Sequence, residues 1–218
     1  MTWRLQRAFA SALLRISPKY HSRVVRRYWE STHDTHADMS SAAFEFYSTR
    51  IAELLGPPGD CGAVLDHGAG DGRIGMQLTA MGYRVQFSEF APRFIERISS
   101  AGYRCYSAHA VPADSFDTIF MNNAIFYVHP SRLPHEIRWL LDRLHGGGRL
   151  LLLDVPTVQR AGRLGGEIPV RVIRKLTRVY QPQAGGFFID EARIAREFPG
   201  VRICDSWCDY RAHLELRR

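Results

Sequence analysis

The stretch VLDHGAGDGR, residues 64–73, decides the fold. Its apolar run ends in Asp66, and Gly68, Gly70 and Gly72 follow at alternate positions. Glycine adopts positive φ readily and lets another group approach the main chain closely. In an open parallel sheet, ligands bind beyond the carboxyl ends of the strands. The stretch therefore predicts a buried strand, a ligand-binding turn and the first residues of a helix.

Apolar runs alternate with helical patterns after this turn. Strands are expected at residues 61–68, 83–90, 103–108, the start of 116–128, 149–155, 201–210 and 212–218. Helices are expected at residues 73–82, 91–102, 131–148 and 189–200, the last with Asp190 as its N-cap. Runs as apolar as residues 149–155 are typical of parallel strands covered by helices on both faces. The pattern predicts an α/β, doubly wound, mostly parallel seven-stranded sheet with an antiparallel C-terminal hairpin.

The N-terminal quarter has a different character. Residues 1–55 are expected to form helices that break near Ser17-Pro18 and again around residues 31–39, and the Gly56–Asp60 stretch GPPGD ends them. We therefore expect an N-terminal helical extension at 1–55 and the main domain at 56–218. Within that domain, residues 157–186 are expected to form an inserted lid with one helical stretch at 170–180.

The charge is unevenly distributed. Lysine and arginine number 29 against 22 acids, which gives a formal net charge of +7. Residues 1–27 contain no acid and include Arg4, Arg7, Arg15, Lys19, Arg23, Arg26 and Arg27. No apolar run reaches the ~18 residues that a membrane span needs, and the N-terminus lacks the apolar core of a signal peptide. Together with four cysteines lacking metal-site spacing, these features favour reduced thiols in a cytoplasmic protein.

Two common nucleotide-binding motifs do not fit. The third glycine of a dinucleotide fingerprint would fall at Arg73, and the chain has no P-loop motif. An acid does end the next expected strand, because Glu89 lies about 20 residues beyond Asp66, where ribose hydroxyls are held in related folds. The sequence thus predicts a ribose-containing cofactor held by another kind of glycine-rich turn.

Four segments in order resemble the class I S-adenosylmethionine-dependent methyltransferases, over a span from about Tyr28 to the C-terminus. They are VLDHGAGDGR at 64–73, FSEF at 87–90, SFDTIFMNNAIFYVHP at 115–130, and LLDRLHGGGRLLLLD at 140–154. The last has Gly146-Gly147-Gly148 where the family usually has Pro-Gly-Gly. The resemblance implies a Rossmann-like fold, methyltransferase activity and S-adenosyl-L-methionine as cofactor.

The resemblance also implies roles for individual residues. The methionine part of the cofactor would lie against the turn, Asp66 would lie near its amino group, Glu89 would accept the ribose hydroxyls, and Phe90 would pack on the adenine. The implied cofactor-binding set is Asp66, Gly68, Ala69, Gly70, Gly72, Glu89, Phe90, Ala108, His109, Asn122 and Tyr28. Ala108 or His109 stands where many members carry an acid for the adenine amine. Tyr28 falls where the family often closes over the cofactor, and core packing is its alternative.

Candidate catalytic residues follow the fourth and fifth strands. An oxygen nucleophile usually benefits from a base, and His129 has a suitable unperturbed pKa; its alternative is a surface loop histidine. Asn123, with Asn122, is expected to orient a nucleophile. Asp154 ends the fifth expected strand, with a loop cap as its alternative. His33 and His36 resemble a metal pair only loosely, so no metal is expected.

The sequence leaves the methyl acceptor open. The basic lid suits an acidic group on a small molecule, glycan or lipid-linked metabolite methylated at an O or N centre. The absence of an Asn-Pro-Pro motif after the fourth strand argues against methylation of adenine or glutamine nitrogens. An RNA methyltransferase and a non-catalytic cofactor-binding module are the alternatives, although no nucleic-acid-binding module is recognisable.

The N-terminal helix has two possible partners. At ~100° per residue, Leu5, Phe9, Ala12, Leu13 and Ile16 share one face and arginines the other, with Leu14 off the apolar face. This pattern is typical of a helix on an anionic membrane surface and equally of a helix packed on its own domain. Peripheral membrane contact through residues 1–27 is therefore one expectation.

Overall fold

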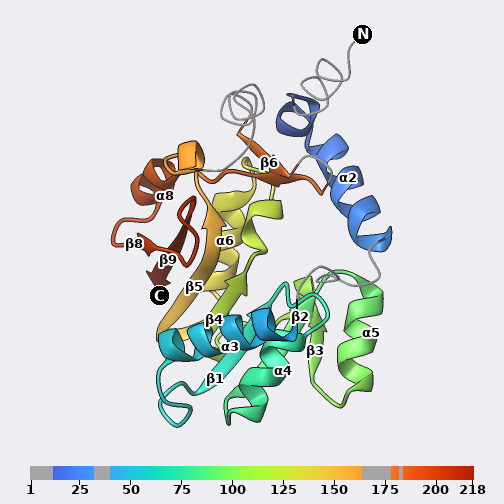
Figure 1. Ribbon diagram of the computed structural model, residues 1–218, viewed down its shortest axis with the longest axis vertical. Helices are drawn as coiled ribbons and strands as arrows, with labels where there is room; N and C mark the ends of the chain where they lie inside the picture. Colours follow the sequence, from blue (N-terminus) through green and yellow to red (C-terminus); the bar gives the residue numbers. More distant parts are fainter. Residues whose placement is uncertain (1–11, 32–39, 164–177, 182–183) are drawn as a thin grey trace. The chain divides into compact units, whose positions relative to one another are not determined.

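The computed structural model describes residues 12–31, 40–163, 178–181 and 184–218 (Figure 1). A seven-stranded sheet has the order β3-β2-β1-β4-β5-β9-β8, and a two-stranded sheet pairs β6 with β7. The strands of the large sheet are β1 (Ala63–His67), β2 (Arg84–Glu89), β3 (Cys105–Ser107), β4 (Phe116–Asn122), β5 (Leu144–Pro156), β8 (Arg202–Asp205) and β9 (Arg211–Arg217). The small sheet contains β6 (Val179–Gln181) and β7 (Gly186–Phe187).

The helices separate the strands as their apolar spacing predicts. The α-helices are α2 (Pro18–Ser31), α3 (Ser41–Leu55), α4 (Arg73–Ala80), α5 (Pro92–Ser100), α6 (Leu133–Leu141) and α8 (Glu191–Glu197). Short 3₁₀ turns occur at Ala108–Ala110, Ile125–Tyr127 and Ala161–Arg163. Residues 12–16 are also helical, and the break before α2 falls at Ser17. Asp190 caps α8, since its side chain accepts a hydrogen bond from the Arg193 N–H.

The pairing confirms the fold class. Strand β1 runs parallel to β2 and β4, and β2 runs parallel to β3. The C-terminal β8 and β9 are antiparallel, with Ile203 opposite Leu214. Buried Val64, Leu65, Phe87, Ile119 and Phe120 supply the sheet interior. The structure is therefore the expected doubly wound α/β sheet with an antiparallel pair at one edge.

Several expected boundaries are wrong; the strand expected at 201–210, for example, ends at Asp205. Residues 131–148 were expected to form a helix ending at the glycines, but α6 ends at Leu141 and β5 begins at Leu144. Gly148 lies in this strand, at a position that favours glycine because a Cβ there would lie 3.0 Å from the Asp117 and His145 carbonyl oxygens. The end of the helix expected at 170–180 is instead β6; residues 164–177 lie outside the described chain.

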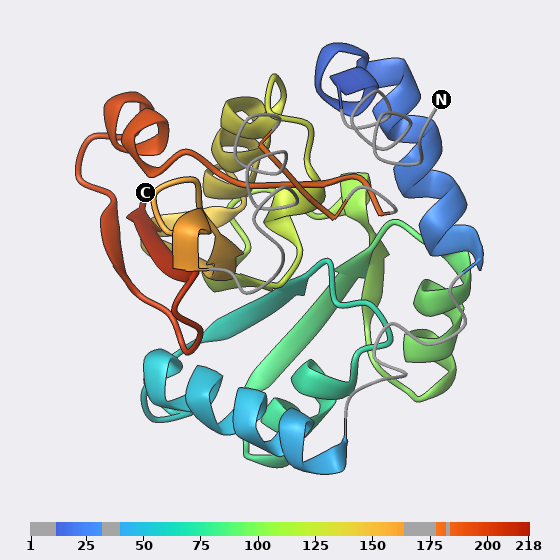
Figure 2. The ribbon, with the colours of Figure 1, turned by 45° about the horizontal axis from the view of Figure 1, so that its top comes forward.

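The chain forms two compact units. Of the described residues, the first unit contains 12–31, 123–137 and those of 152–215, and the second contains 40–122, 138–151 and 216–218. In the second unit, α3 packs beside α4, as both ribbon views show, and α5 packs against β2 and β3 (Figures 1 and 2). The expected domain boundary at residue 55 stays a prediction, because these contacts do not test it.

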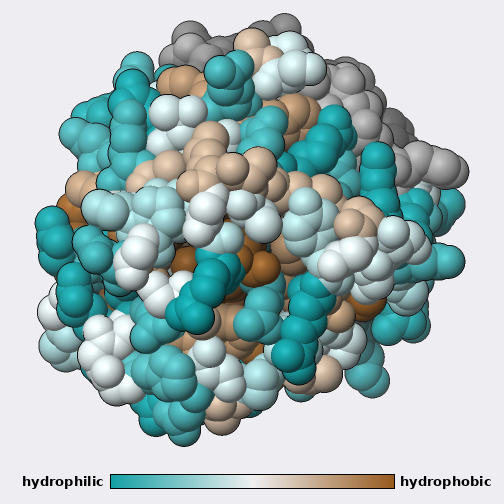
Figure 3. Space-filling view, turned by 90° about the horizontal axis from the view of Figure 1, so that it is seen from below, coloured by the Kyte–Doolittle hydropathy of each residue, from teal (hydrophilic) through white to brown (hydrophobic). Residues whose placement is uncertain are grey.

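The surface is mixed in character. Among the described residues, no helix is long and apolar enough to cross a membrane. Hydrophilic side chains cover most of the coloured part of the face in Figure 3, with small groups of apolar side chains between them.

Candidate functional site

The glycine-rich turn after β1 adopts the conformation for which glycine is needed. Gly68, Gly70 and Gly72 have φ values of 71°, 58° and 81°, in the left-handed region that side chains disfavour. The Gly68 and Ala69 N–H groups both donate to the Ser88 carbonyl, at 2.9 and 3.2 Å. The turn is thereby tied to the end of β2.

Glu89 fastens the same turn from the end of β2. Its Oε2 accepts from the Gly70 N–H at 2.8 Å, and its Oε1 accepts from the N–H groups of Phe90 and Ala91 at 2.7 and 3.2 Å. Burial raises the pKa of Glu89, although these three hydrogen bonds act in the opposite direction. A carboxylate has about four lone-pair sites, so this conformation leaves room for roughly one further donor.

Asp66 is a buried acid beside the turn. Only 4% of its surface is exposed. Burial is the largest cause that raises its pKa to about 8, the negative charge of Glu89 is the next, and the Gly75 N–H hydrogen bond opposes them. Asp66 is therefore mostly protonated at neutral pH and gains from a cationic neighbour.

A fourth glycine, missed in the sequence, lets this cluster form. A Cβ at Gly75 would lie 2.4 Å from Phe87 Cε1 and 2.8 Å from Asp66 Oδ2. Helix α4 can approach β1 and β2 closely because position 75 has no side chain. Asp71 was also missed: it is 1% exposed and forms a salt bridge with Arg73 at 2.6 Å. Its only sequence signal was its place within the turn.

The remaining expected cofactor residues of the second unit lie after strand ends. Phe90 follows β2 and is 47% exposed. Ala108 and His109 form the 3₁₀ turn after β3, with the His109 ring 6.5 Å from that of Trp139. Asn122 ends β4, and its buried Oδ1 has no hydrogen-bond partner among the described residues.

In the first unit, two residues near the ends of strands have an unusual backbone conformation. Asn123 follows β4 with φ 54°, and Asp154 lies in β5 with φ 55°. Positive φ at non-glycine residues is uncommon, although Asn and Asp tolerate it best, and such conformations cluster at functional sites. The Asn123 side-chain amide donates to Asp154 Oδ2 at 3.2 Å. The structure thus brings these two candidates together.

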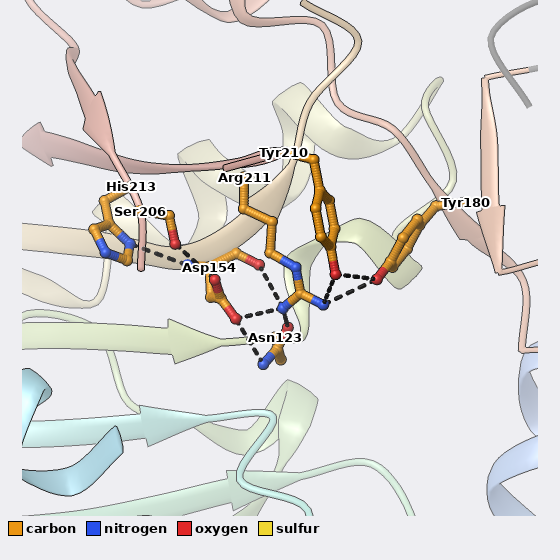
Figure 4. Close-up of polar contacts among 7 residues, drawn as sticks. All are labelled: Asn123, Asp154, Tyr180, Ser206, Tyr210, Arg211 and His213. Atoms are coloured by element: carbon orange, nitrogen blue, oxygen red, sulfur yellow. Dashed lines mark hydrogen bonds and ion pairs between the residues drawn. The ribbon is translucent and has the colours of Figure 1, made fainter. Parts of the chain in front are cut away.

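Arg211, from the start of β9, joins them to two tyrosines (Figure 4). Its Nη1 donates to Asn123 Oδ1 and Asp154 Oδ2. Its Nη2 donates to the hydroxyls of Tyr180 and Tyr210 at 2.9 and 3.1 Å. Although burial opposes its charge, Asp154 and the tyrosines raise the pKa of Arg211 further. Sequence reasoning missed all three of these residues.

Asp154 is held on every side. It is fully buried, and its Oδ1 accepts from Ser206 Oγ at 2.6 Å. Its backbone N–H donates to His213 Nδ1 at 3.1 Å, which places the ring proton of neutral His213 on Nε2. The strand runs two residues beyond it, to Pro156, so Asp154 does not end β5 as expected. This ion-paired carboxylate is arranged to orient Arg211 and Asn123.

His129 is a buried residue, contrary to its alternative as a surface loop histidine. It is 6% exposed. Its Nδ1 lies 2.7 Å from Ser131 Oγ, and its Nε2 lies 3.1 Å from the Arg15 carbonyl oxygen. Its ring centroid is 5.2 Å from that of His21. Both ring nitrogens are engaged within the first unit, which favours an anchoring role for this residue.

The other N-terminal candidates divide by location. Tyr28 lies in α2, with its ring centroid 5.1 Å from that of Trp29, which in turn is 5.2 Å from that of Tyr127. Tyr28 thus belongs to the first unit, and the glycine-rich turn belongs to the second. His33 and His36 lie outside the described residues. All four cysteines are free.

The strand order and the turn after β1 define an open α/β fold of the nucleotide-binding kind. No model of a known protein family matches the chain, and no curated protein matches it in sequence. Its fold is that of the S-adenosylmethionine-dependent methyltransferases, as several solved structures show.

Three of these structures illustrate the likeness. A Burkholderia thailandensis 1,6-didemethyltoxoflavin-N1-methyltransferase shares 20% identity over 93% of this chain and 90% of its own, with a TM-score of 0.59. The Synechocystis magnesium protoporphyrin IX methyltransferase shares 14% over 97% and 96%, with a TM-score of 0.56. A Haemonchus contortus phosphoethanolamine N-methyltransferase shares 16% over 93% of this chain and 50% of its own, with a TM-score of 0.64. At these identities the comparisons establish the fold.

Proposed function

We propose that this chain is an S-adenosylmethionine-dependent methyltransferase that methylates an O or N centre of a small molecule, with a glycan or a lipid-linked metabolite as further acceptor classes. The observation that carries the proposal is the glycine-rich turn hydrogen-bonded to Glu89 beside buried Asp66. The solved structures support it, since those from Burkholderia and Haemonchus contain S-adenosylhomocysteine and the Synechocystis structure contains S-adenosylmethionine.

The residues present suit this cofactor. The turn offers backbone with no Cβ at Gly68 and Gly70 for the methionine part, and Asp66 gains charge stabilisation from an ammonium group. Glu89 accepts a ribose hydroxyl at its remaining lone pair, and a second hydroxyl requires the Gly70 N–H to yield its place. The Oδ1 of Asn122, which has no partner in the described part of the chain, is a further acceptor for a ligand donor.

The chemistry asks mainly for alignment. S-adenosylmethionine supplies a methyl group already activated on a sulfonium. The chain must hold the acceptor in line with that methyl and exclude water, which converts an encounter into an effectively unimolecular step. Asn123, set by Asp154 and Arg211, is the residue of the first unit that we assign to orienting the acceptor.

Calorimetry with S-adenosylmethionine tests the cofactor assignment. Gly70→Val places a branched side chain at φ 58° in the turn, and we expect it to abolish measurable binding. Glu89→Ala removes the ribose acceptor and is expected to cost roughly 1.5–3 kcal/mol. Gly102→Val is the matched control, because Gly102 also has positive φ but has open space around it, in the loop between α5 and β3. Unchanged affinity in both folded turn variants would reject the assignment.

An acceptor screen tests the reaction itself. Methyl transfer from labelled cofactor is read by mass shift over small molecules, glycans, lipid-linked compounds and RNA. Turnover on RNA with strongly salt-dependent binding would replace the small-molecule proposal. Cofactor binding without turnover on a broad panel would indicate a non-catalytic module.

A further inference from the structure

Two tyrosine hydroxyls form a pair that has one hydrogen to spare. The oxygens of Tyr180, in β6, and Tyr210, just before β9, lie 3.3 Å apart, and both accept from Arg211 Nη2. Each phenol carries one hydrogen. One of the two hydrogens serves the bond between the phenols. The other has no acceptor among the described residues, so this hydroxyl pair offers a free donor.

The hydroxyl pair is held rigidly. Arg211 cannot swing away without losing its bonds to Asn123 and Asp154, and only 11% of its side-chain surface is exposed. The Tyr180 ring packs against those of Phe126 and Phe188, with centroids 5.5 and 5.2 Å away. In Figure 4 both phenols point toward the guanidinium. A fixed donor of this kind binds without an ordering cost.

The donor keeps its proton at physiological pH. Burial, followed by the hydrogen bond with Tyr180, raises the pKa of Tyr210 to about 12. A neutral phenol donates to an oxygen lone pair. An ammonium group would instead meet the Arg211 charge, and the neighbouring Asp154 carboxylate is already engaged by Arg211, Ser206 and Asn123. The exposed Lys19, Arg23, Arg26 and Arg27 on α2, in the same unit, also favour an anionic partner.

The position fits an acceptor subsite. The bonds of Arg211 run to Asn123 and Asp154 near the carboxyl ends of β4 and β5, and ligands of open α/β sheets bind beyond such ends. We propose that the hydroxyl pair of Tyr180 and Tyr210, with Arg211 as its positioning residue, binds a hydrogen-bond-accepting oxygen of the methyl acceptor, a carboxylate in first place and a carbonyl in second. The inference that the bound molecule is the methyl acceptor rests on the proposed function. The donor site formed by the two hydroxyls does not depend on it.

Direct binding of simple probes tests the subsite before any acceptor is known. The full chain, with tyrosines labelled at Cζ and saturated with S-adenosylhomocysteine, is titrated with benzoate, benzamide and benzylammonium while the tyrosine signals are followed by NMR. The Tyr180 and Tyr210 signals, assigned from the Phe variants, are expected to shift with benzoate most and benzamide less, and to stay unchanged with benzylammonium. Unmoved signals with both oxygen probes, or equal shifts with benzylammonium, would overturn the proposal.

Four variants separate the subsite from general damage. Tyr180→Phe and Tyr210→Phe each remove one hydroxyl and are expected to weaken benzoate binding roughly three- to tenfold. Tyr106→Phe is the matched control, since it removes a single hydroxyl bonded to Gln86 on β2, and it should leave benzoate affinity unchanged. Arg211→Lys keeps the charge but lacks the planar fork, so it should broaden or shift both tyrosine signals before any probe is added.

A known acceptor extends the test to turnover. In the two hydroxyl variants KM for a carboxylate-bearing acceptor should rise at least threefold while kcat changes less, and the analogue without that oxygen should show no KM change. Failure of S-adenosylmethionine binding in calorimetry would reject the proposed function, and the probe titrations, then run without S-adenosylhomocysteine, would still test the subsite. Normal cofactor binding with unmoved tyrosine signals would reject the subsite alone.

Discussion

At the scale of single residues, the cofactor assignment depends on a carboxyl group kept largely free of water. Asp66 is buried on β1 near Glu89, and its pKa is about 8. In the unfolded chain an aspartate has a pKa near 3.9. Between these values the folded chain holds a proton that the unfolded chain releases, so the free energy of unfolding falls as the pH rises through this window. Buried acids whose pKa is raised in this way are typical of functional sites.

Replacing this carboxyl should therefore stabilise the chain while harming the site. Asp66→Asn is expected to unfold less readily than the parent, with a difference that grows by up to about 1.4 kcal/mol per pH unit between pH 4 and pH 8. Urea unfolding at pH 5 and pH 8 measures this, and S-adenosylmethionine affinity should fall in the same variant. Asp60→Asn, at an exposed position, is the control. A difference that does not grow with pH would show that Asp66 ionises normally.

At the scale of elements, α2 is held to the rest of the first unit by histidines. His21 Nε2 bonds the Gly185 carbonyl oxygen at 3.0 Å, and His129 bonds the Arg15 carbonyl oxygen just before α2. Both rings contact Phe187 of β7, with centroids 5.4 and 5.7 Å away. Burial, followed by the nearby His129, lowers the pKa of His21 and keeps it neutral. These contacts give His129 a structural task.

His129→Ala should consequently act on stability. We expect the free energy of unfolding to fall by roughly 1–3 kcal/mol, because the buried ring loses two hydrogen bonds and its contacts with His21 and Phe187, and turnover to fall less than tenfold. His135→Ala, at an exposed position in α6, is the control, and thermal unfolding with single-turnover kinetics gives both quantities. A loss of 10²–10⁴ in turnover at unchanged stability would instead identify His129 as the general base.

Elements were predictable where local pattern decides them. The apolar runs, the glycine-rich turn and the cap at Asp190 indicated the mostly parallel sheet with its antiparallel C-terminal pair, the acids beside the turn and the start of α8. The glycines at 146–148 led to a wrong prediction of where the helix ends. Glycine often ends helices, but it also occurs in strands at positions where a side chain would not fit. The hydrogen bonds of Arg211 could not be predicted from the sequence, since its partners Asn123, Asp154 and Tyr180 lie 88, 57 and 31 residues away along the chain. Only the folded topology brings them together.

At the scale of the whole molecule, the N-terminal segment has two candidate roles: contact with an anionic membrane surface and packing on its own domain. Leu14 was expected off the apolar face, yet it is 1% exposed and packs with Phe187, Tyr20 and Val24, whereas Ile16 is 73% exposed. The described part of this helix thus belongs to the first unit, because the following α2 fixes which side faces inward. Residues 1–11, including Leu5 and Phe9, lie outside the described chain. Deleting residues 1–16 would remove Leu14 and is expected to destabilise the fold, so deletion cannot test membrane contact.

Charge reversal on α2 tests it without touching the core. The net charge of +7 and the exposed Lys19, Arg23, Arg26 and Arg27 should attract the chain to anionic vesicles, by about 1 kcal/mol per basic residue near the surface, with an attraction that salt weakens. We expect sedimentation with phosphatidylserine-containing vesicles at low salt and none with neutral vesicles. The triple variant Arg23→Glu, Arg26→Glu, Arg27→Glu should remain in the supernatant with its melting temperature nearly unchanged.

The triple variant Arg84→Glu, Arg97→Glu, Arg104→Glu has the same change in net charge on the second unit and should still sediment. If both variants lose binding equally, the attraction reflects net charge alone; if the parent does not sediment at low salt, α2 has no membrane role.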